Sequence, residues 1–354
     1  MNRKNEIFLF NFASSFSGGG LRRLIETAKH FDLEDGAIFI VNKKAERLVK
    51  NYSQNNKFFF VEPNKITRFL NDGYYLRKIL REIGKPDLYF SYGLPIFFNI
   101  ATVNWFHVSN ALSLTTDGIY LSKIKKLEMN VLKQRISKSL KYANIVSAES
   151  EFTLNLLKEN IVSSNLSIFN SVLENGFNPE ELQASSERRE FDGIYSVTVG
   201  SYKYKRLELA LDIHNILKKN SPNLEKFIIV GSKSDLSRKV LGNNDVIVVD
   251  LDDRQRLINL ISGAEYYISA SQIENSSIAA LEGFILSKNI VVSGIPSHRE
   301  MLKDYEYDEI LETKTNTKFF ISSFNKKIDE KSFTSWDEAI SQLKYILDKY
   351  RESL

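Results

Sequence analysis

The chain has 354 residues, which is more than one ordinary hydrophobic core requires, so the length predicts two globular domains with a cleft between them. Its composition, 43% apolar and 26% charged, is typical of a folded protein, and a net charge of +4 is too small to indicate a nucleic-acid-binding protein. The absence of cysteine excludes disulfides and thiol nucleophiles, and the four histidines lack metal-ligand spacing. We therefore expect a cytoplasmic protein without a metal.

Short apolar runs alternate with helical patterns along the first half of the chain. The start has a basic tip and an apolar run like a signal peptide, but Asn11 interrupts the run, so we interpret it as the first strand. Further strands are predicted at residues 36–41, 57–62, 87–93, 102–109, 144–150 and 166–176, and helices at 20–31, 43–52, 65–83 and 122–142. No stretch is apolar over the roughly 18 residues that a membrane-spanning helix needs. The alternation predicts a parallel sheet covered by helices.

A second alternation follows a polar stretch at 183–193 that has the composition of a linker. Strands are predicted at residues 194–200, 226–232, 245–250, 265–271 and 289–294, and helices at 206–220, 253–264, 276–287 and 335–354. We therefore predict α/β domains over residues 1–182 and 183–333. The remaining segment, 334–354, is predicted as a helix that packs back across the domains.

Three glycines, Gly18, Gly19 and Gly20, separate the first strand from the first helix. Glycines there let a ligand approach the backbone, and the N–H groups of a helix start attract an anion. The G-x-G-x-x-G order of a dinucleotide-binding fold is absent. A tight turn without a ligand is the alternative.

The stretch "SASQIENSSIAALEGF", residues 269–284, follows a predicted buried strand and enters a helix. Ser276 or Ser277 can cap that helix, so backbone N–H groups near Ser277 and Ile278 can face a phosphate. Glu274 then lies in the loop and Glu282 on the second helical turn. Because a carboxylate accepts two hydroxyl hydrogen bonds, the pair suits a ribose diol or a sugar. The alternative is two unrelated glutamates.

Cations follow the strand that ends at Gly200. The stretch "VGSYKYKRLELAL" places Lys203, Lys205 and Arg206 directly after it, and lysine is a usual partner of phosphate. A solvated basic loop is the alternative.

These motifs together resemble the retaining glycosyltransferases of family 4. The stretches "VTVGSYKYK", "FIIVGS", "SQIENSSIAALEGF" and "VVSGIPSHREML" occur in the order of that family's second domain, and "FSGGGLRRL", "NWFHVSN" and "ANIVSAESEFTLNLL" look like its first domain. The resemblance extends from about Ile7 to Leu302. It implies the GT-B fold, in which two Rossmann-like domains have parallel sheets facing a central cleft. The N-terminal domain would be the acceptor side, and the C-terminal domain would bind a nucleotide sugar.

The resemblance also implies roles for particular residues. Glu282 would hold the nucleotide ribose, Glu274 the donor sugar hydroxyls and Lys205 the diphosphate. Backbone groups at Ser276, Ser277 and Ile278 would contact phosphate and sugar.

In the first domain, Gly19 and Gly20 would let the diphosphate or the acceptor approach, and His107 would face the donor sugar. A buried structural imidazole is the alternative for His107.

The sequence departs from the family pattern at two places. Ser201, after Gly200, stands where the family usually has arginine, so Lys203 or Arg206 would have to supply that charge. Asn275, Ser276 and Ser277 replace Gly-Phe-Gly, and Ala279 replaces proline. The second set of departures falls on the donor-sugar pocket.

Two further patterns have competing interpretations. Asp250–Asp252 formally match a D-x-D metal motif, but their place at a strand end favours a turn and cap. The segment 123–141 is basic and amphipathic, which suits either an anionic membrane surface or a solvated helix face.

The resemblance implies transfer of a sugar, with retention, from a nucleotide diphospho-sugar to a glycan or lipid-linked glycan, as in bacterial surface polysaccharide synthesis. We expect no cofactor and no nucleic-acid partner. Three alternatives remain open: an epimerase or phosphorylase of similar fold, a noncatalytic carbohydrate-binding protein, and a nicotinamide-dependent oxidoreductase, although the last lacks its glycine fingerprint.

Overall fold

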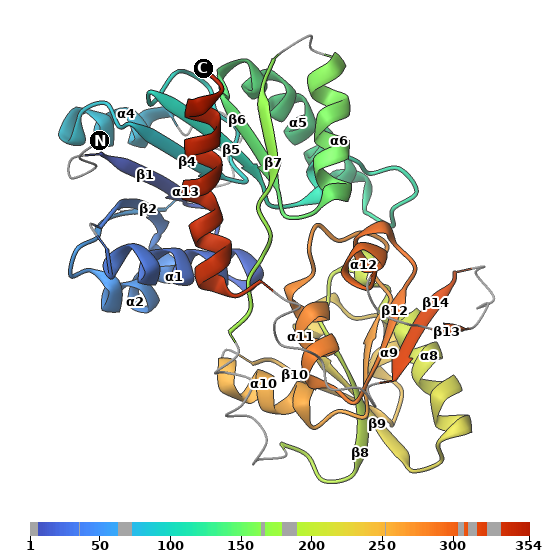
Figure 1. Cartoon of the computed structure of the whole chain (residues 1–354). Helices are drawn as coiled ribbons and strands as arrows, with labels where there is room; N and C mark the ends of the chain where they lie inside the picture. Colours follow the sequence, from blue (N-terminus) through green and yellow to red (C-terminus); the bar gives the residue numbers. More distant parts are fainter. Residues whose placement is uncertain are drawn as a thin grey trace. The chain divides into compact units, whose positions relative to one another are not determined.

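Two compact units make up the computed structural model of the chain (Figure 1). The structure describes residues 6–34, 36–62, 73–163, 167–178, 190–251, 253–303, 308–310, 317–323 and 334–354. The first unit comprises Met1–Thr116, Lys123–Gly176 and Trp336–Leu354, and the second comprises Asp117–Ser122 and Phe177–Ser335. The expected boundary between residues 182 and 183 and most of the expected linker lie outside the described residues.

A seven-stranded parallel sheet forms the centre of the first unit, in the order β3-β2-β1-β4-β5-β6-β7. Its strands are β1 (Phe8–Phe12), β2 (Ile38–Asn42), β3 (Lys57–Val61), β4 (Leu88–Tyr92), β5 (Val103–Val108), β6 (Ile145–Ala148) and β7 (Phe169–Val172). Every residue of β4, β5 and β6 is buried. Parallel strands covered on both faces read as apolar runs, which is why the sequence revealed them.

Helices cover both faces of this sheet. One face packs against α1 (Gly18–Asp32) and α13 (Trp336–Glu352), and the other packs against α4 (Gly73–Ile83), α5 (Lys123–Ser139) and α6 (Glu151–Ser163). Short turns complete the unit: η1 (Lys43–Ala45), α2 (Glu46–Val49), η2 (Lys50–Tyr52), η3 (Ala111–Ser113) and η4 (Leu140–Tyr142). The first part of the helix predicted over 65–83 lies outside the described residues.

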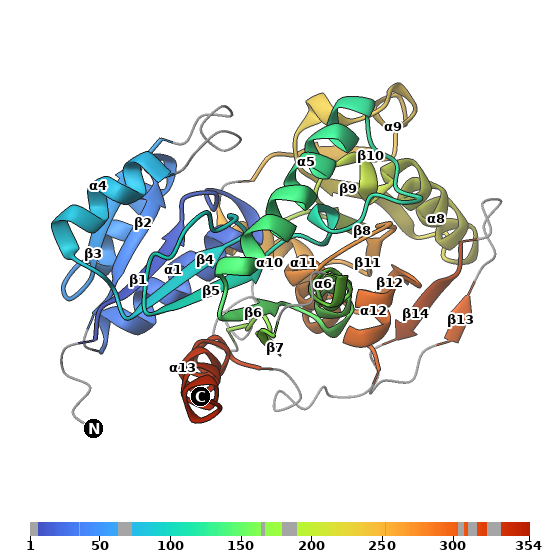
Figure 2. The ribbon, with the colours of Figure 1, turned by 90° about the horizontal axis from the view of Figure 1, so that it is seen from above.

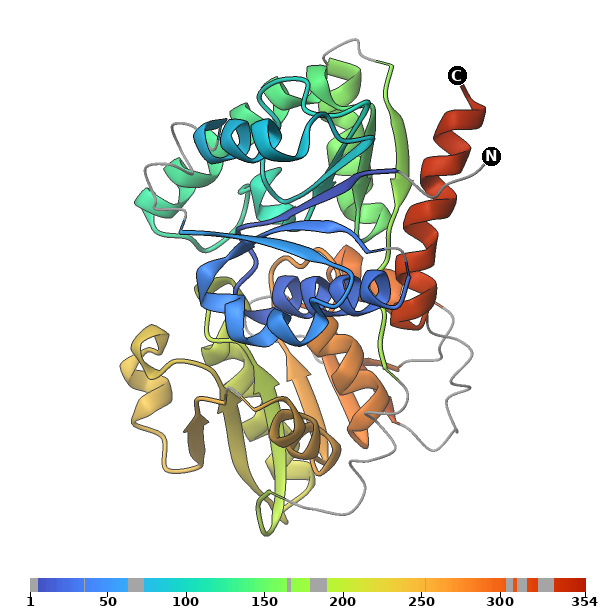
Figure 3. The ribbon, with the colours of Figure 1, turned by 90° about the vertical axis from the view of Figure 1, so that its left-hand side faces the viewer.

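The C-terminal helix α13 packs against α1 (Figure 3). Its apolar stripe, which includes Ile340, Leu343 and Leu347, joins the hydrophobic core beneath α1. Arg351 lies 3.1 Å from the carboxylate of Glu6 and fixes the last turn. In the described residues, the C-terminal helix therefore packs against elements from the N-terminal half of the chain.

The second unit also has a seven-stranded sheet, in the order β10-β9-β8-β11-β12-β14-β13. Figure 2 shows β9, β8, β11, β12, β14 and β13 following one another in this order. The strands are β8 (Ile194–Val199), β9 (Leu224–Val230), β10 (Val246–Val249), β11 (Tyr266–Ser269), β12 (Asn289–Ser293), β13 (Asp308–Ile310) and β14 (Phe319–Ser323). β14 runs antiparallel to β12 and to β13. The sequence did not predict this antiparallel edge.

The helices of the second unit again lie on both faces. α8 (Leu207–Asn220) covers one face, and α10 (Arg254–Ser262) and α11 (Ile278–Leu286) cover the other. The shorter elements are η5 (Lys203–Lys205), η6 (Lys233–Asp235), α9 (Arg238–Leu241) and α12 (Pro296–Met301).

A short segment from the first half of the chain, Asp117–Ser122, belongs to the second unit. The backbone N–H of Tyr120 donates to Oε1 of Gln272 at 2.8 Å, and Nε2 of Gln272 donates to the carbonyl of Gly118 at 3.2 Å. Ile119 is buried. One glutamine side chain therefore holds a segment about 150 residues distant in sequence.

The prediction of two α/β units with parallel sheets is confirmed. In each sheet the strand order reverses beside the first strand, between β1 and β4 and between β8 and β11. Ligands of open parallel sheets bind at the carboxyl ends of the strands next to this reversal. None of the helices in the described part of the chain has the length and apolarity needed to cross a bilayer.

Candidate functional site

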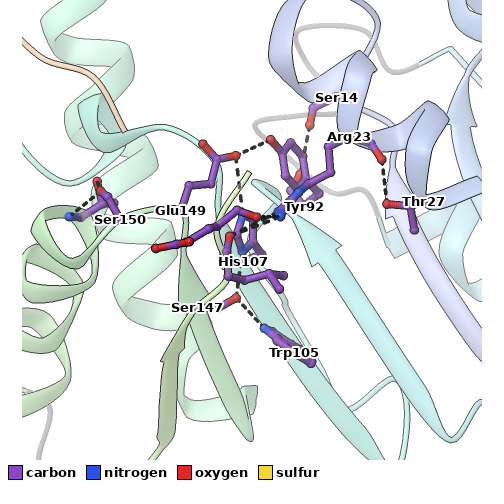
Figure 4. A network of polar contacts seen from close by, with 12 residues as sticks. Ser14, Arg23, Thr27, Tyr92, Trp105, His107, Ser147, Glu149 and Ser150 are labelled. Carbon is purple, nitrogen blue, oxygen red and sulfur yellow. Dashed lines mark hydrogen bonds and ion pairs between the residues drawn. The ribbon is translucent and has the colours of Figure 1, made fainter. Parts of the chain in front are cut away.

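A buried polar cluster lies at the carboxyl ends of β4, β5 and β6 in the first unit. Figure 4 shows Tyr92, His107 and Glu149 pointing toward one another. The Tyr92 hydroxyl donates to Oε1 of Glu149 at 2.7 Å, and Nε2 of His107 lies 3.7 Å from the same oxygen. All three side chains are at most 6% exposed. The parallel register brings Tyr92 beside His107, so neighbouring strand ends assemble the cluster.

His107 has a fixed orientation. Its Nδ1 contacts the Ser147 hydroxyl at 2.8 Å, and the ring packs against the rings of Phe90 and Tyr92 on the neighbouring strand. Burial lowers the pKa of His107 to about 4, although the Glu149 carboxylate opposes the shift. The imidazole is therefore neutral at pH 7. The ring is fully buried, with Nδ1 at the Ser147 hydroxyl and Nε2 facing the Glu149 carboxylate, and it is not a standing cation.

Arg23, on α1, brings a positive charge into this cluster (Figure 4). The side chain is 3% exposed, and its guanidinium donates to the carbonyl oxygens of Leu173 and Glu174. Within the described residues, Nε of Arg23 and Nε2 of His107 have no hydrogen-bond partner. Buried polar atoms without partners are rare in folded proteins, so these two atoms distinguish the cluster from an ordinary core.

The glycine loop borders the same strand ends. Gly18 has φ +60°, and the space where its side chain would lie is open. A Cβ at residue 20 would lie 3.1 Å from the Ser15 hydroxyl and 3.2 Å from the Tyr92 ring, so Gly20 serves close packing. Ser17 makes no side-chain cap at the start of α1. Gly19 is in the first turn of this helix, where N–H groups can face an anion.

In the second unit, Lys205 and Glu274 form an ion pair at the ends of β8 and β11. Nζ of Lys205 lies 2.6 Å from Oε1 of Glu274, and the Ser271 hydroxyl donates to the same oxygen at 2.6 Å. Burial alone would raise the pKa of Glu274, but the charge and hydrogen bond of Lys205 and the bond from Ser271 hold it below its ordinary value. The carboxylate is therefore ionised, and the structure brings together two predicted site residues 69 positions apart.

The backbone before Lys205 requires glycine. Gly200 has φ +98°, and a Cβ there would lie 3.1 Å from Cε of Lys205. Ser201 is 8% exposed and donates its hydroxyl to Asp235 at 3.2 Å. Lys203 is exposed. The serine thus bonds an acid where the resemblance implies a phosphate-binding cation.

Arg206 does not join the Lys205–Glu274 pair. Its Nε donates to the carbonyl of Ala270 at 2.7 Å and its Nη1 to the Thr317 hydroxyl at 3.2 Å. The guanidinium is therefore turned toward the start of β14.

Glu282 has a partner that the sequence did not predict. Nη2 of Arg254, in the first turn of α10, lies 2.6 Å from Oε1 of Glu282, which is 5% exposed. Burial raises the pKa of Tyr267, and the charges of Glu274 and Glu282 add to the shift. The two glutamates therefore share one neighbourhood around this phenol, as the sequence predicted.

The helix start after Glu274 is also as the sequence predicted. Ser277 caps α11, its hydroxyl accepting from the N–H of Ala280 at 3.2 Å, and Ile278 begins the helix. Ser276 lies one residue before the cap. Gly283 touches the Tyr267 ring so closely that a Cβ would lie 2.2 Å from it, so α11 sits directly on β11.

The sequence analysis did not identify four residues of the two clusters: Arg23, Tyr92, Glu149 and Arg254. Each contacts its partner from a different element, so no short motif contains the pair. Only the position of Glu149, just after a buried strand, offered a signal.

In the described ranges, no group of three or more histidine, aspartate or glutamate side chains is arranged so that it could hold a metal ion. Asp252 of the D-x-D match lies outside the described residues, and Asp253 caps α10.

Comparisons with known proteins agree with this architecture. Residues 180–335 match the family described as glycosyl transferases group 1. No curated protein sequence matches the chain.

Solved structures of low identity share the fold over most of the chain. The N-terminal domain of Candida albicans trehalose-6-phosphate phosphatase is 11% identical with a TM-score of 0.63, and 98% of each chain is covered. Anabaena HepE, solved with UDP and glucose, is 14% identical with a TM-score of 0.59, covering 98% of this chain and 91% of its own. A UDP-forming trehalose-phosphate synthase from Burkholderia xenovorans, solved with glucose-6-phosphate, is 9% identical with a TM-score of 0.58, covering 84% and 88%. The predicted GT-B fold is thereby confirmed.

Proposed function

We propose that this chain, whose residues 180–335 match the glycosyl transferases group 1, transfers a sugar from a nucleotide diphospho-sugar to a hydroxyl of a glycan or lipid-linked glycan, with retention. The observation that carries the proposal is the Lys205–Glu274 pair, which lies within the matched region at the reversal of the strand order. A paired cation and carboxylate at this edge suit a ligand that has both phosphates and hydroxyls.

The donor would lie along the β8 and β11 ends of the second unit. Lys205 would contact the diphosphate, Glu274 the sugar hydroxyls and Glu282 the ribose. The N–H groups at the start of α11, from Ser277 and Ile278 onward, would face phosphate, since first-turn N–H groups lack intrahelical partners. Each carboxylate has a cation beside its Oε1, Lys205 for Glu274 and Arg254 for Glu282, and its remaining lone pairs can accept hydroxyl hydrogen bonds.

Departure of the nucleoside diphosphate would be assisted on the face from which the acceptor attacks. Lys205 would offset charge on the leaving group, and the α11 dipole would add to that effect. In the first unit, neutral His107 would hydrogen-bond the donor sugar. Gly19 would leave space for the diphosphate or the acceptor, with Gly20 beside it.

The proposed setting is bacterial surface polysaccharide synthesis at the cytoplasmic face of the inner membrane, as a peripheral protein. Support comes from abundant lysine and asparagine with only 6 prolines. The start of α5 adds to it, because Ile124 and Leu127 are 73% and 66% exposed among lysines.

Thermal stabilisation by UDP, GDP, dTDP and CMP sugars tests the donor site in the parent and in Glu282→Ala. At a concentration a hundredfold above Kd, a bound ligand stabilises by about 2.7 kcal/mol. We expect one nucleotide family to raise the Tm of the parent and to lose most of that effect in Glu282→Ala. Each ligand-induced shift is compared with the same variant without ligand, because Glu282→Ala also removes the carboxylate that lies 2.6 Å from Nη2 of Arg254.

Glu265→Ala is the matched control, since Glu265 is an acid of the same unit that pairs with exposed Lys288. Its ligand-induced shift should equal that of the parent. A shift that survives Glu282→Ala undiminished, or no shift with any nucleotide sugar, would contradict the assignment.

A further inference from the structure

The second unit contains an open pocket of about 400 Å³. It lies at the carboxyl end of β12, beside the β11 loop and the start of β14, and Ser293 and Gly294 are among its lining residues. A volume of this size holds a ligand of monosaccharide size or larger. None of Lys205, Glu274 and Glu282 lines it. The pocket is therefore distinct from the proposed donor cluster.

Cations dominate the lining of this pocket. Arg206, Arg299 and Lys318 line it, and Asp117 is the one acid among the lining residues that the structure describes. Several cations converging on one volume favour an anion that has more than one charged oxygen, such as phosphate.

Two of these cations are held in place. Nε of Arg299 donates to the carbonyl of Gly294 at 3.0 Å, and its guanidinium lies 5.4 Å from the Phe320 ring centroid. Arg206 uses two of its five N–H donors on Ala270 and Thr317 within the described residues. Cations fixed in this way lose little side-chain entropy when an anion binds.

The backbone at Arg206 is strained. Its φ of 49° is the one positive value among the non-glycine residues that the structure describes. Such left-handed conformations cost free energy for bulky residues and cluster at ligand sites. Arg206 stands in this conformation at the N-cap of α8, its guanidinium bonds the Ala270 carbonyl, and its side chain lines the pocket.

One wall of the pocket is the segment that crosses from the first half of the chain. Asp117, Gly118 and Ile119 line it together with Gln272. Because the Gln272 amide bonds both Gly118 and Tyr120, it fixes this wall relative to the β11 loop. Gln272 thus belongs both to the loop that carries Glu274 and to the lining of the pocket.

We propose that this pocket binds a phosphate group of the acceptor, so that the acceptor is a phosphorylated sugar or a diphosphate-linked lipid. The inference rests on the proposed function and specifies its acceptor class. Two anions would bind in one unit: the donor diphosphate near Lys205 and the acceptor phosphate between Arg206, Arg299 and Lys318. Arg206, next to Lys205 in sequence, would separate the two.

Calorimetric titration of the full chain tests the pocket with four probes: inorganic phosphate, glucose, glucose 6-phosphate and farnesyl diphosphate. The Arg299→Ala/Lys318→Ala double variant removes two cations from exposed positions. Lys219→Ala is the control, because Lys219 is an exposed lysine at the far end of α8. We expect glucose 6-phosphate or farnesyl diphosphate to bind the parent, glucose not to bind, and the double variant to raise Kd at least tenfold while the control leaves it unchanged.

The identity of the probe that binds distinguishes a sugar phosphate from a lipid diphosphate. Equal Kd values in the parent and the double variant, or binding of inorganic phosphate alone, would overturn the inference, as would no binding at all. The nucleotide-sugar panel with Glu282→Ala separates this failure from that of the proposed function. If a nucleotide sugar stabilises the protein as expected while the titration fails, the donor assignment stands and the acceptor pocket is rejected. If the titration succeeds while no nucleotide sugar binds, the pocket is a phosphate site but the proposed function is wrong.

Discussion

Lys205 and Glu274 form an ion pair in which each side chain is only 12% exposed. Removing charges from water is costly, and only close geometry with added hydrogen bonds offsets that cost. Ser271 supplies such a bond. The ion pair therefore stabilises the folded protein only when both partners are present. Removal of one partner leaves the other as a buried charge without a counterion.

Replacing Lys205 with methionine is expected to lower the free energy of unfolding by about 3 kcal/mol at pH 7, because Glu274 becomes a buried unpaired carboxylate. In the parent, the lowered pKa of Glu274 means that its contribution is present above the ordinary pKa of 4.5 and is lost as the pH falls through the lowered value. In Lys205→Met, burial raises that pKa instead, so protonation relieves the penalty. Urea unfolding at pH 7 and pH 4.5 should show a deficit that shrinks in acid.

The control is Lys288→Met, which breaks an exposed pair with Glu265 and should cost under about 1 kcal/mol at both pH values. Adding Glu274→Gln to Lys205→Met should recover part of the loss. Equal losses in Lys205→Met and Lys288→Met would contradict the argument.

At the scale of elements, α5 differs from the other helices of the first unit at its start. Residues 123–127 are all exposed, and they combine three lysines with Ile124 and Leu127. Later in the helix Ile136 is buried in the core beneath β5 and β6. The helix is therefore anchored at its end and presents a basic and apolar first turn, which is the combination that binds anionic lipid surfaces.

Cosedimentation with phosphatidylserine-containing vesicles tests this helix. A lysine near an anionic surface contributes about 1 kcal/mol, so Lys125→Gln/Lys126→Gln should weaken vesicle partitioning roughly 30-fold at physiological ionic strength. Ile124→Ser/Leu127→Ser should also weaken it. Leu33→Ser is the control, since Leu33 is 80% exposed at the end of α1. Unchanged partitioning of both double variants would indicate a merely solvated helix face.

On the scale of the whole molecule, three buried histidines couple stability to pH. His107 lies in the first unit, and His214 and His298 lie in the second. Burial lowers the pKa of each to about 4, from an ordinary value of 6.5. Because the folded pKa is lowered, the unfolded chain binds more protons between these values, so stability is full above pH 6.5 and falls as the pH drops toward 4.

Between pH 6.5 and about 4, each of these histidines should lower the free energy of unfolding by about 1.4 kcal/mol for each unit that the pH falls. Because the second unit has two of them and the first unit has one, acid should destabilise the second unit more steeply than the first. The two tryptophans, Trp105 and Trp336, both lie in the first unit, so fluorescence follows that unit while circular dichroism follows both. His107→Phe should flatten the pH dependence seen by fluorescence between pH 7 and 5. His214→Phe should leave the fluorescence transition unchanged, and the reverse pattern would disprove the assignment.

Some features of the whole molecule could be predicted from the sequence and others could not. The strands were visible because both faces of each parallel sheet are covered, so β1 and β11 read as apolar runs. The Gly200 turn, the Ser277 cap and the closeness of Glu274 and Glu282 were also predictable, since each depends on residues within one short stretch. The antiparallel strands β13 and β14 were not predicted, and β13 has only three residues.

Periodicity and turn chemistry are local, so the two α/β units, the position of their loops and the predicted donor motif could be read from the sequence. Three contacts became visible in the folded chain alone: Arg254 pairs with Glu282, Arg23 enters the cluster of His107 and Glu149, and Gln272 holds Asp117–Ser122 in the second unit. The order of the strands in a sheet sets which loop ends become neighbours. That order depends on the packing of the whole chain and is not written in any one segment.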